Sequence, residues 1–176
     1  SGDARYATTF TPDALGRITD TVETTASGER PLAYTYDTAD RLTEVRRDGA
    51  LVEQYAYDAN GNRTSAILGT SSTATYDAHD RLLTYGPTSI VHDANGRLVE
   101  RTQGPQRTTY SHDAFGNLRA VTLPNGRVIS YVIDARGRRI GKRVDGTLVQ
   151  GFLYAGDFRP VAELDAAGTV VARFVY

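Results

Sequence analysis

The amino-acid sequence predicts an all-β protein made of tandem antiparallel β-hairpins. Three observations predict this fold class: an aspartate-centred turn signal that recurs about every 20 residues, aromatic residues two positions apart before each turn, and a second turn signal between successive aspartates. β-branched Thr and Val are plentiful, and no segment keeps the helical apolar period of about 3.6 residues beyond two turns. Helices are therefore not expected.

The repeated turn begins at one of eight aspartates: Asp13, Asp37, Asp58, Asp77, Asp93, Asp113, Asp134 and Asp157. Three positions later, seven copies have glycine or aspartate and the last has proline: Gly16, Asp40, Gly61, Asp80, Gly96, Gly116, Gly137 and Pro160. Because glycine adopts positive φ freely and aspartate is enriched there among other residues, this position is expected to be left-handed. The leading aspartate is expected to accept hydrogen bonds from backbone N–H groups further along and so to cap the turn.

Aromatic side chains form two columns before the turns. Three positions before the aspartate, six of the eight copies are aromatic: Phe10, Tyr34, Tyr55, Tyr110, Tyr131 and Tyr154. One position before it, five of the central copies have Tyr36, Tyr57, Tyr76, His92 and His112. Residues two apart share one face of a strand, so both columns lie on one face. Cross-strand packing is the first interpretation, and stacking of an exposed aromatic ladder on a sugar is the alternative.

A second turn signal separates each pair of aspartates: Ser27-Gly28, Asp48-Gly49, Gly69-Thr70-Ser71-Ser72, Gly86-Pro87, Gly104-Pro105, Asn125-Gly126 and Asp145-Gly146, with Ala167-Gly168 after the last. Asp-Gly and Asn-Gly are the preferred two-residue hairpin turns. Each repeat therefore supplies two strands, which gives a meander on the order of 16 strands.

Composition excludes several classes of function. The chain has 176 residues, 40% of them hydrophobic and 23% charged, and is expected to fold as one domain. The 20 Lys and Arg nearly balance the 21 Asp and Glu, so a nucleic-acid or anionic-membrane partner is not expected. Without cysteine there is no disulfide or thiolate chemistry, and no apolar run approaches the roughly 20 residues that span a bilayer.

Arginine follows the turn at a fixed position in five copies: Arg17, Arg41, Arg81, Arg97 and Arg138. We expect these arginines to pair with the equally regular aspartates along adjacent turns. A column of guanidinium groups that binds phosphate or carboxylate ligands is the alternative, and together with the tyrosines it would form a ligand-binding surface.

Three patterns in the sequence resemble chemical sites. One carboxylate per roughly 20 residues is too sparse for calcium, which takes six to eight oxygen ligands. His79, His92 and His112 occupy a turn and two tyrosine positions, which does not predict a zinc site. The close carboxylates Asp37/Asp40 and Asp77/Asp80 belong to the turn motif itself, so acid–base catalysis is not expected there. The sequence predicts no catalytic residue, no metal and no cofactor.

A repeated Tyr-Asp-Ala-x-Gly-Arg-Leu unit, seen at residues 36–42, 57–63 and 76–82, resembles the YD repeats of bacterial Rhs proteins. Similar repeats occur in wall-associated proteins, in the cocoon components of toxin complexes, and in teneurins. The resemblance implies a long curved or spiralling sheet that forms part of a shell. It also implies a structural, non-enzymatic role: the shell encloses or presents a C-terminal toxin domain at the surface of a bacterium or after secretion.

The resemblance divides the chain into a lead-in at residues 1–9, seven YD repeats at 10–153 and a divergent closing repeat at 154–176. Ser1-Gly2 reads as an expression scar, and an export signal is expected outside the sequence. The expected partners are the rest of the shell and the enclosed toxin domain. A β module that binds a glycan or a cell-surface protein is the alternative function. Exposed strand edges also predict an edge-to-edge homodimer.

Overall fold

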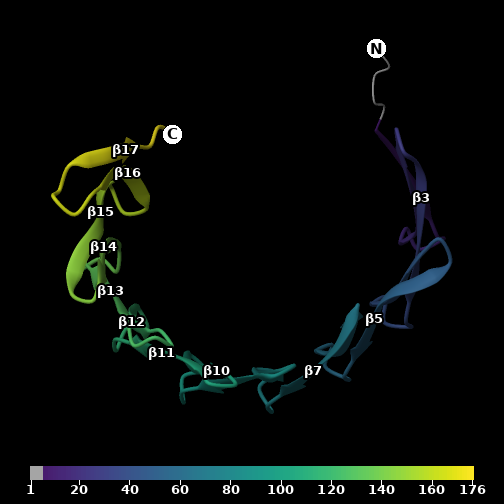
Figure 1. Ribbon diagram of the computed structural model, residues 1–176, viewed down its shortest axis with the longest axis horizontal. Coiled ribbons are helices and arrows are strands. Elements are labelled where there is room, and N and C mark those ends of the chain that lie inside the picture. Colours follow the sequence, from purple (N-terminus) through teal and green to yellow (C-terminus); the bar gives the residue numbers. More distant parts are fainter. Residues whose placement is uncertain (1–5) are drawn as a thin grey trace. The chain divides into compact units, whose positions relative to one another are not determined.

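The computed structural model describes residues 6–176, so the predicted scar at Ser1-Gly2 lies outside the described residues. The chain forms two compact units, residues 1–86 and 87–176, which we call the N-terminal unit and the C-terminal unit. The described residues of both units contain β-strands and turns and no helix (Figure 1). The predicted all-β fold is therefore confirmed.

The N-terminal unit is a meander in which every strand pairs antiparallel with the next. Its eight strands are β1 (Ala7–Pro12), β2 (Ile18–Thr25), β3 (Gly28–Tyr36), β4 (Leu42–Arg47), β5 (Ala50–Tyr57), β6 (Arg63–Leu68), β7 (Thr70–Tyr76) and β8 (Leu82–Tyr85). The aspartate turns all follow odd-numbered strands, so within this unit they lie at one edge of the sheet.

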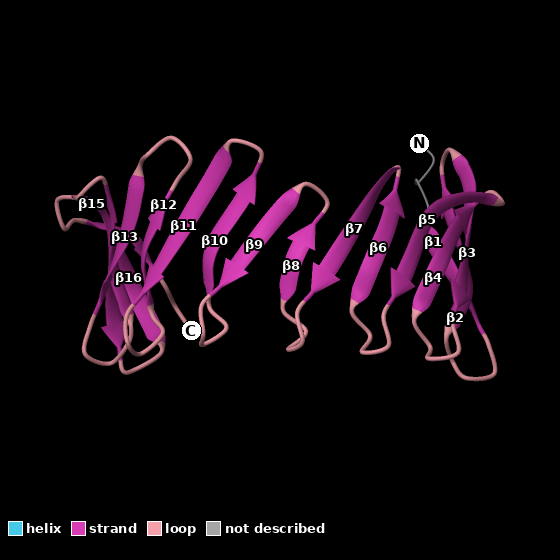
Figure 2. Cartoon of the chain, turned by 90° about the horizontal axis from the view of Figure 1, so that it is seen from below, coloured by secondary structure: helices cyan, strands magenta, loops and turns pink. Residues whose placement is uncertain are grey.

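The C-terminal unit repeats this arrangement, again with consecutive antiparallel pairs. Its nine strands are β9 (Thr88–His92), β10 (Leu98–Gln103), β11 (Gln106–His112), β12 (Leu118–Thr122), β13 (Val128–Ile133), β14 (Arg139–Val144), β15 (Thr147–Ala155), β16 (Arg159–Leu164) and β17 (Val170–Arg173). Figure 2 shows the strands of each unit side by side, joined by short loops at alternating ends.

Each unit is a sheet with a thin core. Among the described residues, the buried hydrophobic side chains are Val45, Ala66, Ala74, Val121 and Ala162. Four of them lie directly opposite tyrosines on neighbouring strands: Val45 pairs with Tyr34, Ala66 with Tyr55, Ala74 with Tyr85 and Val121 with Tyr110. In a single-layer sheet such cross-strand pairs supply most of the side-chain packing, which is why the aromatic column sits on one face.

The opposite ends of the hairpins close with tighter turns. Asp48 and Gly49 both have positive φ (50° and 79°), as do Asp145 and Gly146 (49° and 85°), which is the backbone of a type I′ turn. The predicted two-residue turn at Asn125-Gly126 is wrong. There the N–H of Leu123 donates to Arg127 O and the N–H of Gly126 donates to Leu123 O, a five-residue turn like those led by aspartate.

Candidate functional site

The aspartate turns share one backbone geometry. In the turn between β3 and β4, the N–H of Asp40 donates to Asp37 O at 3.1 Å and the N–H of Asp37 donates to Arg41 O at 2.9 Å. The strand register slips by one residue beside it, between Thr35 and Tyr36. This is a type I turn followed by a left-handed residue that forms a bulge. The same two backbone bonds occur in the turns led by Asp13, Asp58, Asp77, Asp93, Asp113 and Asp134.

The residue three positions after the aspartate is left-handed in all seven of these turns. Asp40 has φ of 61° and Asp80 has φ of 59°. The glycines at the same position have φ between 76° and 91°: Gly16, Gly61, Gly96, Gly116 and Gly137. This position therefore accepts only glycine or aspartate in these seven turns because its backbone is left-handed, as the sequence indicated.

The leading carboxylate caps the turn from inside. Asp37 Oδ1 accepts the N–H of Ala39 at 2.9 Å and the N–H of Arg41 at 3.0 Å. The other six leading aspartates accept the corresponding pair of N–H groups. Hydrogen bonds to the charged form lower a carboxyl pKa. Although partial burial opposes it, the N–H groups of Arg81 and His79 and the Arg81 side chain lower the pKa of Asp77 to about 2.

Each arginine that follows a turn binds the aspartate of its own turn. Arg41 Nε donates to Asp37 Oδ2 at 2.8 Å, and the same ion pair forms at four other turns, by Arg17, Arg81, Arg97 and Arg138. These five ion pairs lie within one turn, whereas the expected pairing with an aspartate of the adjacent turn forms at Arg17, which also binds Asp40. Asn62 and Asn117 replace the arginine in two turns and donate to Asp58 and Asp113.

The same side chain also reaches forward to the next turn. Arg41 Nη1 donates to Asp58 O at 2.9 Å, and Arg97 Nη1 donates to Asp113 O at 3.0 Å. Where the next turn has aspartate in the glycine position, the forward bond goes to that side chain: Arg17 Nη1 lies 2.5 Å from Asp40 Oδ1. Likewise, Asn62 Nδ2 lies 2.6 Å from Asp80 Oδ1. The sequence predicted coupling between adjacent turns through aspartate side chains, but it did not predict the bonds to the backbone carbonyls of Asp58 and Asp113.

The tyrosines before the turns tie neighbouring hairpins together. Tyr36 Oη donates to Ile18 O at 2.7 Å and Tyr57 Oη donates to Leu42 O at 2.8 Å. The guanidinium group of Arg41 lies 4.7 Å from the centroid of the Tyr57 ring. Arg17, Arg41 and Arg138 are thus each held between a carboxylate of their own turn and a tyrosine ring of the next hairpin, which combines an ion pair with a cation–π contact.

The tyrosines three positions before the turns also pack against side chains of neighbouring strands. Arg63 lies 5.4 Å from the centroid of Tyr55, and Arg139 lies 5.0 Å from that of Tyr131. Tyr34 Oη shares a hydrogen bond of 3.2 Å with the hydroxyl of the buried Thr21. The Tyr55 hydroxyl donates to Glu53, and this bond together with partial burial raises the pKa of Tyr55 to about 12.

The predicted eighth turn is wrong. Tyr154, Asp157 and Pro160 do not occupy the turn positions that the sequence predicted for them. Tyr154 pairs with Pro160 across the hairpin, just as Tyr36, one position before its turn aspartate, pairs with Leu42. Tyr154 therefore stands one position before the turn, and Ala155 occupies the aspartate place. Pro160 lies in β16, and Asp157 instead pairs with Arg136 Nη1 at 2.5 Å.

A further aspartate turn lies between β16 and β17, at the opposite edge of the C-terminal unit. Asp165 Oδ1 accepts the N–H of Ala167 and the N–H of Thr169, both at 2.9 Å. Gly168 takes the left-handed position with φ of 82°. The sequence Asp165-Ala166-Ala167-Gly168 carried the full signal, but alignment on Asp157 assigned the turn to the wrong hairpin.

The candidate chemical sites do not converge. Within residues 6–176, no group of three or more His, Asp or Glu side chains could hold a metal ion. Asp37 caps its turn while Asp40 binds Arg17, so this carboxylate pair is engaged in separate contacts. His92 and His112 take tyrosine positions, and the Nδ1 atom of each is buried without a hydrogen-bond partner.

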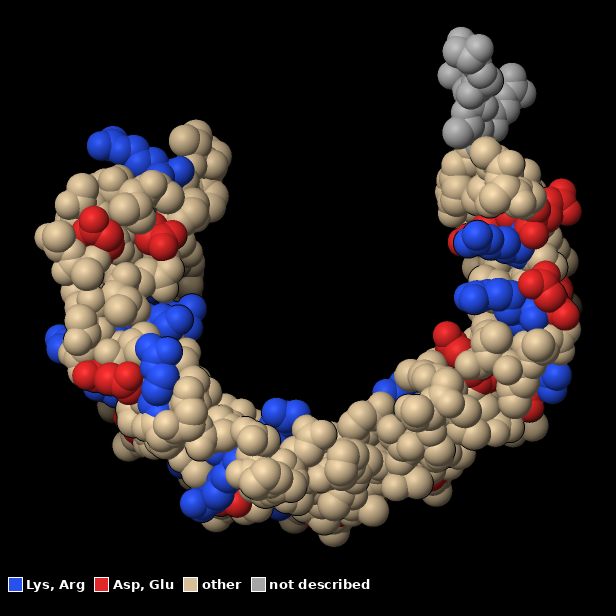
Figure 3. Space-filling model, viewed as in Figure 1, with Lys and Arg blue, Asp and Glu red and all other residues tan. Residues whose placement is uncertain are grey.

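In Figure 3, lysine and arginine side chains lie beside aspartate and glutamate side chains in several places, separated by stretches of other residues. This follows from the repeated pairing of arginine with aspartate at the turns. Residues 6–176 contain no helix that is long and apolar enough to cross a membrane. The charged groups at the turns therefore contact mainly other residues of the repeats.

These clamped turns and paired aromatic columns define a YD-repeat β-sheet. A family profile described as Teneurin YD-shell matches residues 1–168. The chain therefore belongs to the YD-shell family.

Relatives match the chain over only a small part of their own length. The tRNA nuclease WapA of Bacillus subtilis is 35% identical over 143 residues, which cover 77% of this chain and 6% of that protein. The probable deoxyribonuclease RhsA of Dickeya dadantii is 30% identical over 70% of this chain and 10% of its own. Teneurin-3 of Danio rerio is 29% identical over 78% of this chain and 5% of its own. The chain thus spans about a tenth or less of these relatives.

Solved structures share the fold. The crystal structure of TcdB2-TccC3 without its hypervariable C-terminal region superposes with a TM-score of 0.59 and 16% identity, over 93% of this chain and 10% of that one. The structure of TcdB2-TccC3 gives a TM-score of 0.53, also at 16% identity and 93% coverage of this chain, and covers 9% of its own. The hairpin array therefore has the same fold as a part of those chains.

We predict that acid weakens the fold through the turn carboxylates. The folded-state pKa of Asp77 is lowered from 3.8 to about 2, so its stabilising effect is complete above about pH 4 and is lost as the pH falls towards about 2. The pKa values of the other leading aspartates shift in the same direction. Urea denaturation across this range should show a falling free energy of unfolding, and a constant value down to pH 2 would contradict the assignment.

The corrected position of the last aspartate turn gives a matched pair of variants. Asp165→Ala removes two capping hydrogen bonds and should lower Tm by about 2–4 °C. Asp157→Ala removes only an ion pair between exposed side chains and should change Tm by less than about 1 °C. Thermal unfolding followed by circular dichroism tests this, and the reverse order of effects would restore Asp157 as the capping residue.

Proposed function

We propose that the chain is a structural wall segment of the YD shell of an Rhs-type or toxin-complex protein. Its partners would be the rest of that shell and a C-terminal toxin domain that the shell encloses or presents. Such a protein would act after secretion or at a bacterial cell surface. The proposed divisions of the segment are YD repeats at 10–153 and a closing repeat at 154–176.

One observation carries this proposal: at five of the turns the side chain that follows the turn donates a hydrogen bond to the next turn or loop. Arg41 and Arg97 donate to the backbone of the following turn, and Arg17 donates to its side chain. These polar groups are satisfied by the repeat itself, which favours a wall over a binding face. Membership of the YD-shell family supports the same function.

The alternative of a glycan-binding module needs free aromatic and guanidinium groups. The hydroxyls of Tyr36, Tyr57 and Tyr76 donate to backbone carbonyls of the preceding hairpin. Arg41 and Arg138 have their guanidinium groups in ion pairs and over tyrosine rings. These contacts favour the packing interpretation of both columns.

The proposal predicts that the shell protects the C-terminal domain from proteases and that the wall segment itself has no nuclease activity. In the longer polypeptide that contains this segment, trypsin should digest the C-terminal domain much more slowly than it digests the same domain expressed alone. Equal rates would contradict enclosure. The purified chain itself, incubated with tRNA and duplex DNA, should leave both intact, and cleavage that copurifies with the folded chain would contradict a structural role.

A further inference from the structure

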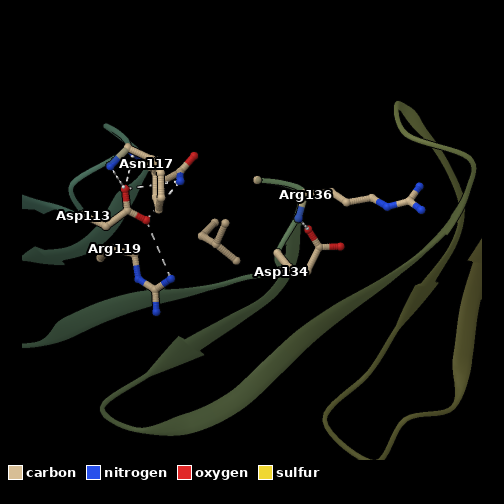
Figure 4. A pocket seen from close by; sticks show the side chains of 9 residues that line it. Asp113, Asn117, Arg119, Asp134 and Arg136 are labelled. Atoms are coloured by element: carbon tan, nitrogen blue, oxygen red, sulfur yellow. Dashed lines mark hydrogen bonds and ion pairs between the residues drawn. The ribbon is translucent and has the colours of Figure 1, made fainter.

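An open groove of about 480 Å³ lies between two neighbouring turns of the C-terminal unit. It is lined on one side by Asp113, Phe115 and Asn117 and on the other by Ile133, Asp134 and Gly137. Figure 4 shows Asp113, Asn117 and Arg119 on one side, and Asp134 and Arg136 across from them. Phe115 is 92% exposed, so its ring is accessible to a ligand.

In this groove the forward bond between neighbouring turns is missing. Asn117 occupies the arginine position and uses its Nδ2 to bind Asp113 Oδ2 at 3.0 Å. Its side chain is too short to reach the carbonyl that a guanidinium group would reach. At the other asparagine turn, Asn62 is compensated by Asp80, whose carboxylate extends back towards it. The corresponding residue here is Gly137, which has no side chain to close the gap.

The turns on either side show what fills this space elsewhere. Arg97 binds Asp93 through Nε and donates through Nη1 to Asp113 O. Arg138 binds Asp134 in the same way and donates forward to Gly156 O. Among the hydrogen bonds of residues 6–176, Asp134 O accepts only the N–H of Gly137. By contrast, Asp113 O accepts both the N–H of Gly116 and the guanidinium of Arg97.

We propose that this groove binds the arginine side chain of a partner peptide, whose guanidinium group takes the place left by Asn117. The guanidinium would donate to Asp134 O and to the Asp113 carboxylate, as Arg97 does one turn earlier. The exposed ring of Phe115 and the side chain of Ile133 would contact its planar faces and aliphatic stem. The site is independent of whether the chain encloses a toxin.

The two resident cations leave room for this ligand. Arg136 extends away from Asp113 and Asn117 in Figure 4, and its Nη1 pairs with Asp157 at 2.5 Å. Arg119 Nη1 lies 4.0 Å from Asp113 Oδ2, at the limit of an ion pair, and its side chain is 46% exposed. An incoming guanidinium can therefore displace Arg119 from Asp113 into solvent without breaking a close contact.

The test uses N-acetyl-arginine amide as the probe, with the lysine and citrulline amides for comparison. Titration followed by two-dimensional NMR should shift the amide resonances of Asp134 and Gly137. The arginine probe should bind about tenfold more tightly than citrulline, because charge-assisted hydrogen bonds are stronger than neutral ones. Lysine should also bind more weakly, because an ammonium group cannot form the planar two-point contact. Equal binding of arginine and citrulline would overturn the proposal.

Asn117→Arg should abolish binding, because the new side chain fills the groove from within the chain, as Arg97 and Arg138 do at their own turns. The matched control Asn62→Arg makes the same change at a turn in the other unit and should leave binding unchanged. Phe115→Ala, which alters an exposed ring and not the turn backbone, should weaken binding severalfold. Wild-type affinity in the Asn117 or Phe115 variant, or an unfolded Asn117 variant, would contradict the proposal.

Discussion

The structure depends on one repeated interaction. A carboxylate at the start of a turn binds the arginine that follows the same turn, and this arginine also donates a hydrogen bond to the next turn. A single-layer sheet buries few side chains, and only five hydrophobic residues are buried in the described chain. Backbone pairing alone leaves such a sheet free to twist and fray at its turns. Arg17, Arg41, Arg97 and Arg138 each bind their own turn and the following one, so they fix the spacing of neighbouring hairpins at the turns.

The sequence predicted the features that are local. Period-two aromatics and the exchange of glycine for aspartate report strand faces and left-handed residues directly, and the structure has both. The direction of the arginines was not predictable, because a turn can place a guanidinium towards its own carboxylate or a neighbour's. Asp157 was misassigned since alignment followed the aspartate, whereas register is set by the pairing of Tyr154 with Pro160. Asp165, which caps a turn, was therefore overlooked.

The same interaction explains both the proposed function and its exception. In the proposed wall, the arginine and aspartate side chains of the turns bind one another and the neighbouring turns, so few of them are free to bind a substrate. This agrees with membership of the YD-shell family. Where an arginine is replaced, the groups it would have satisfied become available. Asp80 supplies a substitute at the Asn62 turn, but Gly137 supplies none at the Asn117 turn. The forward bond that Arg97 and Arg138 form is thus missing at the Asn117 turn.

Amide hydrogen exchange in the Arg97→Leu variant tests the central claim most directly. Arg97 belongs to the turn at residues 93–97 and donates forward to Asp113 O. The account predicts faster exchange of the N–H groups of Asp113 and Gly116 as well as those of the variant's own turn. Arg107→Leu, which removes an exposed arginine paired with Glu100, should leave the turn at 113–117 unchanged. Faster exchange confined to residues 93–97 would show that the turns are independent and would contradict the account.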